Sequence, residues 1–341
     1  MSADDERRVT ITAIAREAGV SVPTVSRVLN GRSDVAPDTR ERVEELLRHH
    51  GYRRRGSRTV RRADLVDLVF NDLDSPWAVE IIRGVEDVGH AAGVGTVVSA
   101  VHQESSSTRQ WLHNLRARAS DGVIVVTSHL SPPVQAQLRR LNVPVVVVDP
   151  AAGVAGTDAP AIGATNWNGG LAATEHLLKL GHRRIGFVAG PPHLLCSRAR
   201  LDGYRTALAA AGVPTDDRLV RPGDFYHASG YTAGDELLGL DDPPTAIFAA
   251  SDQMAFGVYE AVRRRGLRVA DDVSVVGFDD LPEARWASPP LTTVRQPLVE
   301  MGRLAARTVL RLAQGEEIES PRIELATELV VRDSTAPPAA R

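Results

Sequence analysis

Short polar side chains and one arginine lie together between residues 21 and 30 of this 341-residue chain. The guanidinium of Arg27 matches the O6 and N7 acceptors of guanine, and such a two-bond contact provides about 1–3 kcal/mol of discrimination between bases. Val22 offers an apolar contact to a thymine methyl group. Hydroxyl and amide groups that suit phosphate contacts, which position a protein without reading sequence, stand at Ser21, Thr24, Ser26 and Asn30. This combination predicts a surface that contacts duplex DNA.

A helix has to present these side chains, and residues 9–52 predict three short helices. The first covers about 12–18, the second begins after Ser21 as its N-cap and ends at Asn30, and the third runs from Pro37 to Gly51. Gly19 provides the tight turn between the first two helices. This order is that of a helix-turn-helix, whose second helix enters the major groove. The alternative is an ordinary helical hairpin.

Positive charge is concentrated at the start of the chain. Residues 1–62 have a balance of +5, whereas the remainder has a balance of −8. Residues 53–63, RRRGSRTVRRA, contain six arginines and are typical of a linker. We therefore expect only the first module to meet a polyanion.

Composition narrows the class of protein. A hydrophobic content of 43% with 24% charged residues is typical of a globular chain. No stretch of about eighteen apolar residues is present, and the N-terminal residues do not resemble a secretory signal. The single cysteine, Cys196, excludes a disulfide framework and a thiolate zinc site. We expect a cytoplasmic protein without cofactor or metal.

From residue 65 onward, short β-branched runs alternate with segments of helical periodicity. This rhythm predicts parallel sheets with helices on both faces. It occurs in two blocks that divide near residue 160, which predicts two similar lobes with a cleft between them. Ligands of such sheets bind outside the carboxyl ends of the strands, so the loops after each strand are the expected site.

The segments AREAGVSVPTVSRVLNG and VAPDTRERVEELLRHHGY closely resemble the DNA-binding module of the lactose-repressor (LacI/GalR) family. The resemblance continues in GHRRIGFVAGP (181–191), RLDGYRTAL (200–208), PTAIFAASDQMAFGVYEAV (244–262), DVSVVGFDD (272–280) and PPLTTVRQP (289–297). Each fragment is weak alone, but their order and spacing are specific, and they cover nearly the whole chain.

The resemblance implies an N-terminal all-α helix-turn-helix domain and an α/β two-lobed sensor domain like that of the type I periplasmic binding proteins. On this basis we expect the helix-turn-helix in 1–52, an arginine-rich hinge in 53–63, the two-lobed domain in 64–335 and a disordered tail in 336–341. The first lobe is expected in about 64–160 with a return segment near 290–300. The second lobe is expected in 161–288 with 301–332.

In this family a small molecule closes the cleft and moves the DNA-reading heads of a dimer. Some members are released from DNA by their ligand, and a few need a corepressor. We expect a transcriptional repressor that a sugar, a mono- or short oligosaccharide, releases from its operator. The tail APPAAR has no leucine heptad for a tetramer, so we expect a homodimer on a palindromic operator. The residues expected to contact DNA are Thr10, Ser21, Val22, Pro23, Thr24, Ser26, Arg27, Asn30, Arg54, Arg55 and Arg58.

The linker departs from the family pattern. It is about three residues shorter than the usual hinge helix, and Val60 is its only aliphatic residue, where relatives place a leucine that wedges into the minor groove. We expect weaker DNA bending and a steep salt dependence, because the arginines can follow phosphates.

The resemblance also places effector-binding residues after the strands. Trp77 stands where the family has an aromatic side chain that covers a sugar face, although a core or interface role is equally open. Arg200 stands at the ligand-contacting arginine, with a surface ion pair as the alternative, and Asp279 at the ligand-binding aspartate. The remaining candidates are Asp72, which could instead bond backbone amides, Asp74, Phe225 and, as a weak contact, Ser251.

Other positions are expected to be structural or stay open. Asp252 is interpreted as the N-cap of the following helix, and Asp280 and His182 as structural. Leu298 replaces an aromatic residue of some sugar-binding members, so the ligand cannot be taken from one relative. Trp286 lies either at the cleft mouth or at a dimer contact.

Three other functions fit the sequence less well. No catalytic or phosphate-binding motif is present, which argues against an enzyme. A purine corepressor would need aromatic side chains on both faces of a base, which Trp77 and Phe225 could supply. A transported-sugar-binding protein would share the core but would carry an export signal and no DNA-binding module.

Overall fold

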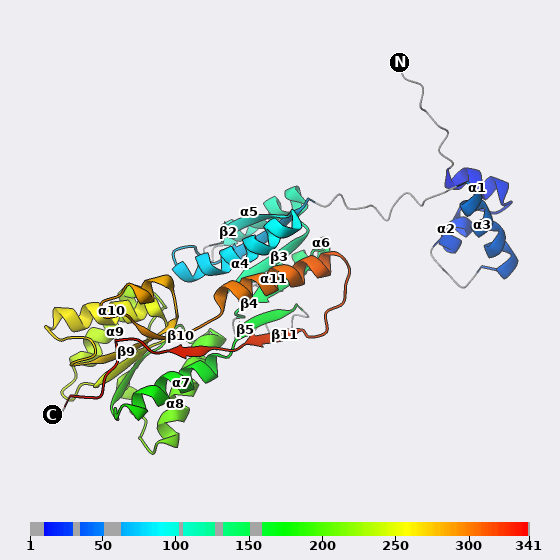
Figure 1. The fold of residues 1–341 in the computed structure, drawn as a ribbon. Helices are drawn as coiled ribbons and strands as arrows, with labels where there is room; N and C mark the ends of the chain where they lie inside the picture. Colours follow the sequence, from blue (N-terminus) through cyan, green and yellow to red (C-terminus); the bar gives the residue numbers. More distant parts are fainter. Residues whose placement is uncertain are drawn as a thin grey trace. The chain divides into compact units, whose positions relative to one another are not determined.

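The computed structural model describes residues 10–29, 35–50, 63–101, 105–126, 132–150 and 159–339. The chain divides into two compact units, Met1–Arg62 and Ala63–Arg341, so the division falls within the predicted linker. Figure 1 shows the helical N-terminal unit and the α/β unit. None of the helices in the described ranges is long and apolar enough to cross a membrane.

The N-terminal unit consists of three helices, α1 (Ile11–Glu17), α2 (Val22–Leu29) and α3 (Pro37–His49). Each helix starts and ends within two residues of its predicted bounds. Ile14 and Val25 are fully buried together with Val43, so each helix contributes to one small apolar core.

Side-chain caps begin the first two helices. The Thr10 hydroxyl accepts a hydrogen bond from the backbone N–H of Ala13 at 3.2 Å. The Ser21 hydroxyl accepts one from the backbone N–H of Thr24 at 3.3 Å. Both bonds satisfy an N–H group that has no partner within its own helix, as predicted for Ser21. Gly19 has a φ of +67° in the turn, a conformation that costs glycine little.

Two six-stranded sheets form the second unit, one in each lobe. In the first lobe the strand order is β11-β5-β4-β3-β1-β2, and all described pairs are parallel. Its elements are β1 (Leu65–Phe70), α4 (Pro76–Ala92), β2 (Gly95–Ala100), α5 (Ser105–Arg118), β3 (Gly122–Val126), α6 (Pro132–Leu141), β4 (Val145–Val148), β5 (Ala161–Ala164), α11 (Leu298–Ala313) and β11 (Arg322–Leu325).

In the second lobe the strand order is β12-β10-β9-β8-β6-β7, and only β12 is antiparallel to its neighbour. Its elements are α7 (Asn166–Lys179), β6 (Ile185–Val188), α8 (Leu195–Ala210), η1 (Asp217–Leu219), β7 (Val220–Arg221), α9 (His227–Leu238), β8 (Ala246–Ala249), α10 (Asp252–Arg264), β9 (Ser274–Asp279), η2 (Pro282–Arg285), β10 (Thr292–Arg295) and β12 (Glu328–Val330). The described fold is the predicted two-lobed α/β architecture.

Helices cover both faces of each sheet, which explains why the central strands are almost purely apolar. In the first lobe α4 and α11 share one apolar cluster with the sheet, and α5 and α6 share another. In the second lobe α7 packs against α8, and α9 packs against α10. The first lobe therefore has two apolar clusters and the second lobe has one.

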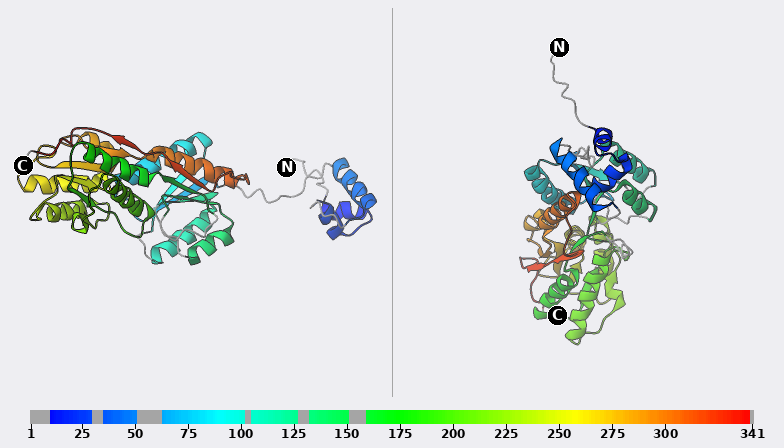
Figure 2. Two further views of the ribbon diagram at one scale, coloured as in Figure 1. Left: turned by 90° about the horizontal axis from the view of Figure 1, so that it is seen from below. Right: turned by 90° about the vertical axis from the view of Figure 1, so that its right-hand side faces the viewer.

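The predicted division of the chain between the lobes is wrong in three places. Residues 161–164 form β5 of the first sheet, the segment near 290–300 contributes β10 to the second sheet, and residues 298–325 return to the first lobe as α11 and β11. Figures 1 and 2 show α11 (orange) beside α4 (cyan). Helix packing fixes this position, because a Cβ atom on Gly84 or Gly302 would lie within 2.4 Å of a carbonyl oxygen of the other helix.

The end of the chain also differs from expectation. The carbonyl oxygen of Ala336 bonds the Ser274 hydroxyl at 3.0 Å and His182 Nε2 at 2.9 Å. Ser334 is fully buried and bonds the backbone of β9. The start of the predicted disordered tail is therefore part of the second lobe. The same bonds confirm the structural role of His182, a residue that is 1% exposed.

Candidate functional site

The helix-turn-helix residues form an exposed face of the N-terminal unit. Val22, Pro23 and Arg27 are exposed on α2, whereas Val25 and Val28 are buried beneath them. Thr10 and Ser21 are exposed at the helix starts, and Thr24 and Ser26 are half-buried on α2. This arrangement leaves the predicted base-reading side chains accessible at the surface of the unit. Asn30, Arg54, Arg55, Arg58 and the predicted hinge lie outside the described residues.

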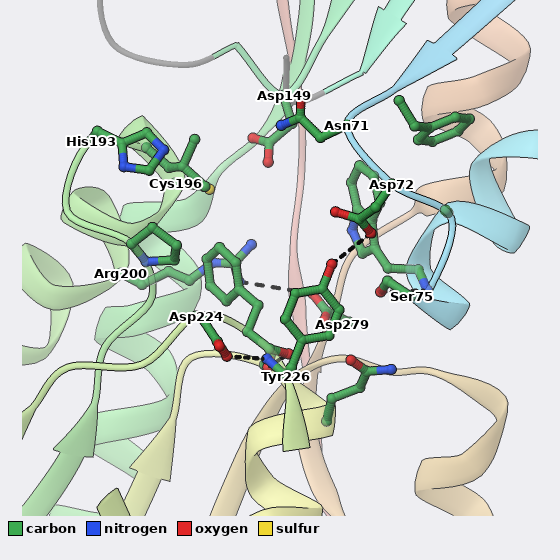
Figure 3. Close-up of a pocket in the computed structure, with 18 residues that line it drawn as sticks. Asn71, Asp72, Ser75, Asp149, His193, Cys196, Arg200, Asp224, Tyr226 and Asp279 are labelled. Carbon is green, nitrogen blue, oxygen red and sulfur yellow. Dashed lines mark hydrogen bonds and ion pairs between the residues drawn. The ribbon is translucent and has the colours of Figure 1, made fainter. Parts of the chain in front are cut away.

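A cavity of about 300 Å³ lies between the two lobes. Its walls come from the residues that follow β1, β4, β6, β7, β8 and β9, at the carboxyl ends of the strands. Figure 3 shows polar side chains that project into this space from both lobes. The volume falls at the lower end of the usual range for small-molecule sites, and the location is the one predicted from the strand order.

Six of the seven predicted effector-binding residues line this cavity: Asp72, Trp77, Arg200, Phe225, Ser251 and Asp279. The seventh, Asp74, is exposed and does not line it; its backbone N–H donates to Asp72 Oδ1 at 3.4 Å. The structure therefore brings together residues separated by more than 200 positions in sequence.

Arg200 is the positive charge at the base of the cavity. It lies on α8 and is only 3% exposed. Its Nε donates to Asn166 Oδ1 at 2.8 Å, and its Nη1 donates to the carbonyl oxygen of Ala250 at 2.5 Å. The guanidinium lies 3.8 Å from the centre of the Phe278 ring. Arg200 is thus held rigidly by buried partners, and the surface ion pair considered from the sequence is wrong.

Asp279 faces Arg200 without a direct hydrogen bond. Nη1 of Arg200 and Oδ1 of Asp279 are 3.8 Å apart, and the same oxygen accepts a bond from Gln296 Nε2 at 2.7 Å. Burial raises the pKa of the Asp279 carboxyl to about 7, and the positive charge of Arg200 opposes this rise. The carboxylate is therefore poorly solvated and would gain from hydroxyl donors on a ligand.

Asp149 is a second buried acid of the cavity, and the sequence did not identify it. It follows β4 and is 6% exposed. Burial raises the pKa of its carboxyl, while Arg200 and a hydrogen bond with Cys196 lower it. Burial beside Asp149 also raises the pKa of the Cys196 thiol well above its usual value, so this thiol stays protonated.

Tyr226 connects the two lobes across the cavity. Its hydroxyl donates to Asp72 Oδ1 at 2.6 Å, from the loop before α9 to the loop after β1 (Figure 3). Burial and this carboxylate raise the pKa of the Tyr226 phenol, so the group acts as a donor. The contact holds the first lobe directly to the second.

The backbone around the cavity is strained at several lining residues. Asp149, Phe225 and Asp279 have φ values of +49°, +77° and +124°, a region that non-glycine residues rarely occupy. Such conformations concentrate at ligand sites because the surrounding structure must enforce them. Gly190 makes room for Phe225, since a Cβ atom there would lie 2.2 Å from its ring.

Several secondary predictions have clear outcomes. Ser251, not Asp252, is the N-cap of α10, because its hydroxyl accepts from the Met254 N–H at 3.2 Å. The Asp252 carboxylate turns inward and accepts bonds from the Leu281 N–H at 2.8 Å and the Thr293 hydroxyl at 2.5 Å. The N-cap assignment of Asp252 is therefore wrong, and its structural role is confirmed.

The remaining secondary positions lie away from the cavity walls. Asp280 pairs with Arg295 at 2.7 Å and also with Arg332, which confirms a structural role. Leu298 is buried in the first-lobe core. Trp286 is 76% exposed and is not part of the cavity wall, so its role at the cleft mouth or at a dimer contact stays a prediction.

Other lining residues were missed by sequence reasoning. The polar ones are Asn71, Ser75, Asp149, His193, Cys196, Asp224, Tyr226 and Gln253. Two of these carried a usable signal: Asp149 is the first polar residue after the apolar run VVVV, and Tyr226 directly follows Phe225.

Comparison with known proteins agrees with both units. Residues 10–55 match the model of the lacI family of bacterial regulatory proteins, and residues 174–335 match that of periplasmic binding protein-like domains. The transcriptional regulator CelR of Thermobifida fusca is 38% identical over 96% of this chain and 98% of its own. The transcriptional repressor CytR of Escherichia coli K12 is 32% identical over 97% of both chains.

Solved structures show the same relationship. A CelR–cellobiose complex aligns with a TM-score of 0.75 at 37% identity, over 96% of this chain and 100% of the other. A lac repressor dimer bound to operator and an anti-inducer aligns with a TM-score of 0.70 at 30% identity, over 97% and 100%. These relatives are transcriptional regulators rather than enzymes. This chain belongs to the lacI family of bacterial regulatory proteins.

Proposed function

We propose that this protein is a sequence-specific, DNA-binding transcriptional repressor that a sugar releases from its operator. The observation that supports this most strongly is the cavity between the lobes. It combines Trp77 and Phe225 with a buried arginine and two buried carboxylates, which suits a ligand with apolar ring faces and several hydroxyl groups. The solved complex of CelR with cellobiose supports a mono- or short oligosaccharide.

The proposed effector contacts have distinct roles. Trp77 and Phe225 cover ring faces, Arg200 donates from its guanidinium, and Asp279 and Asp72 accept from hydroxyl groups. Ser251 already caps α10, so we assign it a minor contact at most. Asp74 is not retained as an effector contact because it lies away from the cavity wall.

The proposed DNA contacts follow from α2. Arg27 reads a base, Val22 and Pro23 lie against base edges, and Thr10, Ser21, Thr24 and Ser26 contact phosphates. A lac repressor dimer binds its operator in the solved structure, and we propose that this chain also acts as a homodimer on a palindromic site. We propose that the protein is cytoplasmic, because a bacterial transcriptional repressor binds the chromosome in that compartment.

A thermal-shift screen of the full chain tests the effector class. Glucose, xylose, ribose, arabinose and cellobiose are compared with adenine and guanine, each at saturating concentration. A sugar that binds only the folded state raises the melting temperature, and the shift grows with concentration. Asp279→Asn should remove the shift, whereas the surface variant Asp271→Asn should retain it. If only the purines raise the melting temperature, the effector is a purine corepressor rather than a sugar.

A further inference from the structure

The charges that face the cavity between the lobes are unequal. Four carboxylates line it, against one guanidinium and one imidazole among the described lining residues. Figure 3 shows the acids on several sides of the space: Asp72, Asp149, Asp224 and Asp279. Asp224 is exposed and screened by solvent, but Asp149 and Asp279 are 6% and 5% exposed. When both buried acids are ionised, they outnumber the buried guanidinium of Arg200, and the unscreened charge of this cavity is negative.

The single guanidinium is partly occupied by protein acceptors. Nε of Arg200 bonds Asn166 and Nη1 bonds the Ala250 carbonyl, with Asp279 3.8 Å from Nη1. One face of the guanidinium lies against the Phe278 ring. A phosphate or carboxylate that approached the remaining donors would have to lie beside the Asp279 carboxylate. Two of the three guanidinium nitrogens are thus engaged by the protein itself, which weakens the fork as an anion-binding group.

Burial has already made these acids difficult to ionise. The pKa values of both Asp149 and Asp279 are raised, chiefly by desolvation, and Asp149 adds to the rise at Asp279. A further negative charge would strengthen this repulsion in a poorly solvated site. Hydroxyl groups have the opposite effect, because they donate hydrogen bonds to the carboxylates without adding charge.

We infer that the cavity accepts uncharged sugars and discriminates against phosphorylated and carboxylate-bearing sugars. The inference rests on the proposed function, since it assumes that the effector occupies this cavity. It assigns Asp149 and Asp279 a second role as the groups that exclude anions. Like-charge contacts in a desolvated interface predict discrimination on the order of a hundredfold in affinity.

Calorimetric titration of the full chain with matched ligand pairs tests this inference. The pairs are glucose with glucose 6-phosphate, cellobiose with cellobionate, and adenosine with adenosine monophosphate. We expect the uncharged member of whichever pair binds to bind at least about a hundredfold more tightly. Asp149→Asn should narrow this ratio at least about tenfold, because it removes one buried charge. The control Asp271→Asn removes an exposed aspartate charge of the second lobe, away from the cavity, and should leave the ratio unchanged.

The outcomes separate this inference from the proposed function. If a sugar pair binds and the anionic member is equal or tighter, the inference is overturned and the sugar-responsive function stands. If only adenosine binds and its phosphate does not, the sugar assignment fails while the charge discrimination holds. If Asp149→Asn leaves the ratio unchanged, size rather than charge excludes the anion, and the inference is overturned. If no member of the panel binds, both fail.

Discussion

Replacing Arg200 by methionine should destabilise the second unit strongly. Methionine keeps an apolar stem against the Phe278 ring but removes the positive charge and the hydrogen bonds to Asn166 and Ala250. The buried oxygens of Asn166 and Ala250 lose their donor, and Asp279 loses its counter-charge at 3.8 Å. Breaking a buried charge pair by removing one partner costs about 3–5 kcal/mol, and we expect Arg200→Met to lower the free energy of unfolding by that amount.

A second substitution should restore much of this loss. In Arg200→Met/Asp279→Asn neither charge remains, and the amide oxygen at position 279 can still accept from Gln296 Nε2. Replacing both members of a buried pair is often close to neutral, although the oxygens of Asn166 and Ala250 stay without their donor. The double variant should therefore be more stable than Arg200→Met by at least about 2 kcal/mol.

Urea unfolding followed by circular dichroism measures these differences. Arg205→Met is the matched control, because Arg205 lies on the same helix but forms an exposed pair with Asp217 at 3.4 Å. That change should alter the free energy of unfolding by less than about 1 kcal/mol. A loss below about 1 kcal/mol for Arg200→Met, or purely additive effects in the double variant, would refute the description of Arg200 as the buried counter-charge.

Three further predictions concern other parts of the molecule. Raising the pH from 6 to 8 should strengthen effector binding, because hydroxyl donors favour the ionised carboxylate of Asp279. The pKa of this group is about 7 in the free protein. Calorimetry that shows weaker binding at pH 8 would contradict this prediction. Gly190→Ala should weaken effector binding at least about tenfold by displacing Phe225, whose ring would lie 2.2 Å from the added Cβ; unchanged affinity would show that Phe225 is not a contact. Thr10→Ala should lower the stability of the N-terminal unit by about 1 kcal/mol, since it removes the cap of α1; an unchanged melting curve of that unit would contradict the cap.

Local sequence patterns predicted most of the individual elements. Runs such as LVDLVF and DGVIVV lie at β1 and β3 in the centre of the first sheet, where both faces are covered. The turn at Gly19 and the cap at Ser21 predicted the start of α2. These features depend on neighbours within a few residues, so the sequence contains the whole signal.

The assignment of segments to lobes depends on contacts that the local pattern does not contain. The apolar face of α11 is compatible with either sheet, and only its close packing on α4 through Gly84 and Gly302 selects the first lobe. The short strand AIGA has no β-branched alternation, yet it pairs with β4 and β11. Such choices are made by tertiary packing rather than by periodicity.

The candidate site was likewise predicted from the sequence only in part. The rule that ligands bind at the carboxyl ends of strands, together with family resemblance, identified Asp72 and Asp279. Tyr226 was missed because its importance comes from a bond across the two lobes at 2.6 Å. Gln296 was missed because it lies where the chain crosses from β10 to α11, and only the folded chain brings it to Asp279.

The most direct test of the proposed regulation is operator binding by the full chain with and without effector. The operator is first selected from random duplex DNA, and its affinity is then measured by fluorescence anisotropy at fixed salt. A saturating sugar identified by the thermal screen should weaken operator binding by about 5–150-fold, the usual range of allosteric coupling. Asp279→Asn should bind the operator equally with and without that sugar. An unchanged operator affinity in the wild-type protein, with the sugar bound, would contradict the proposed link between the cavity and DNA.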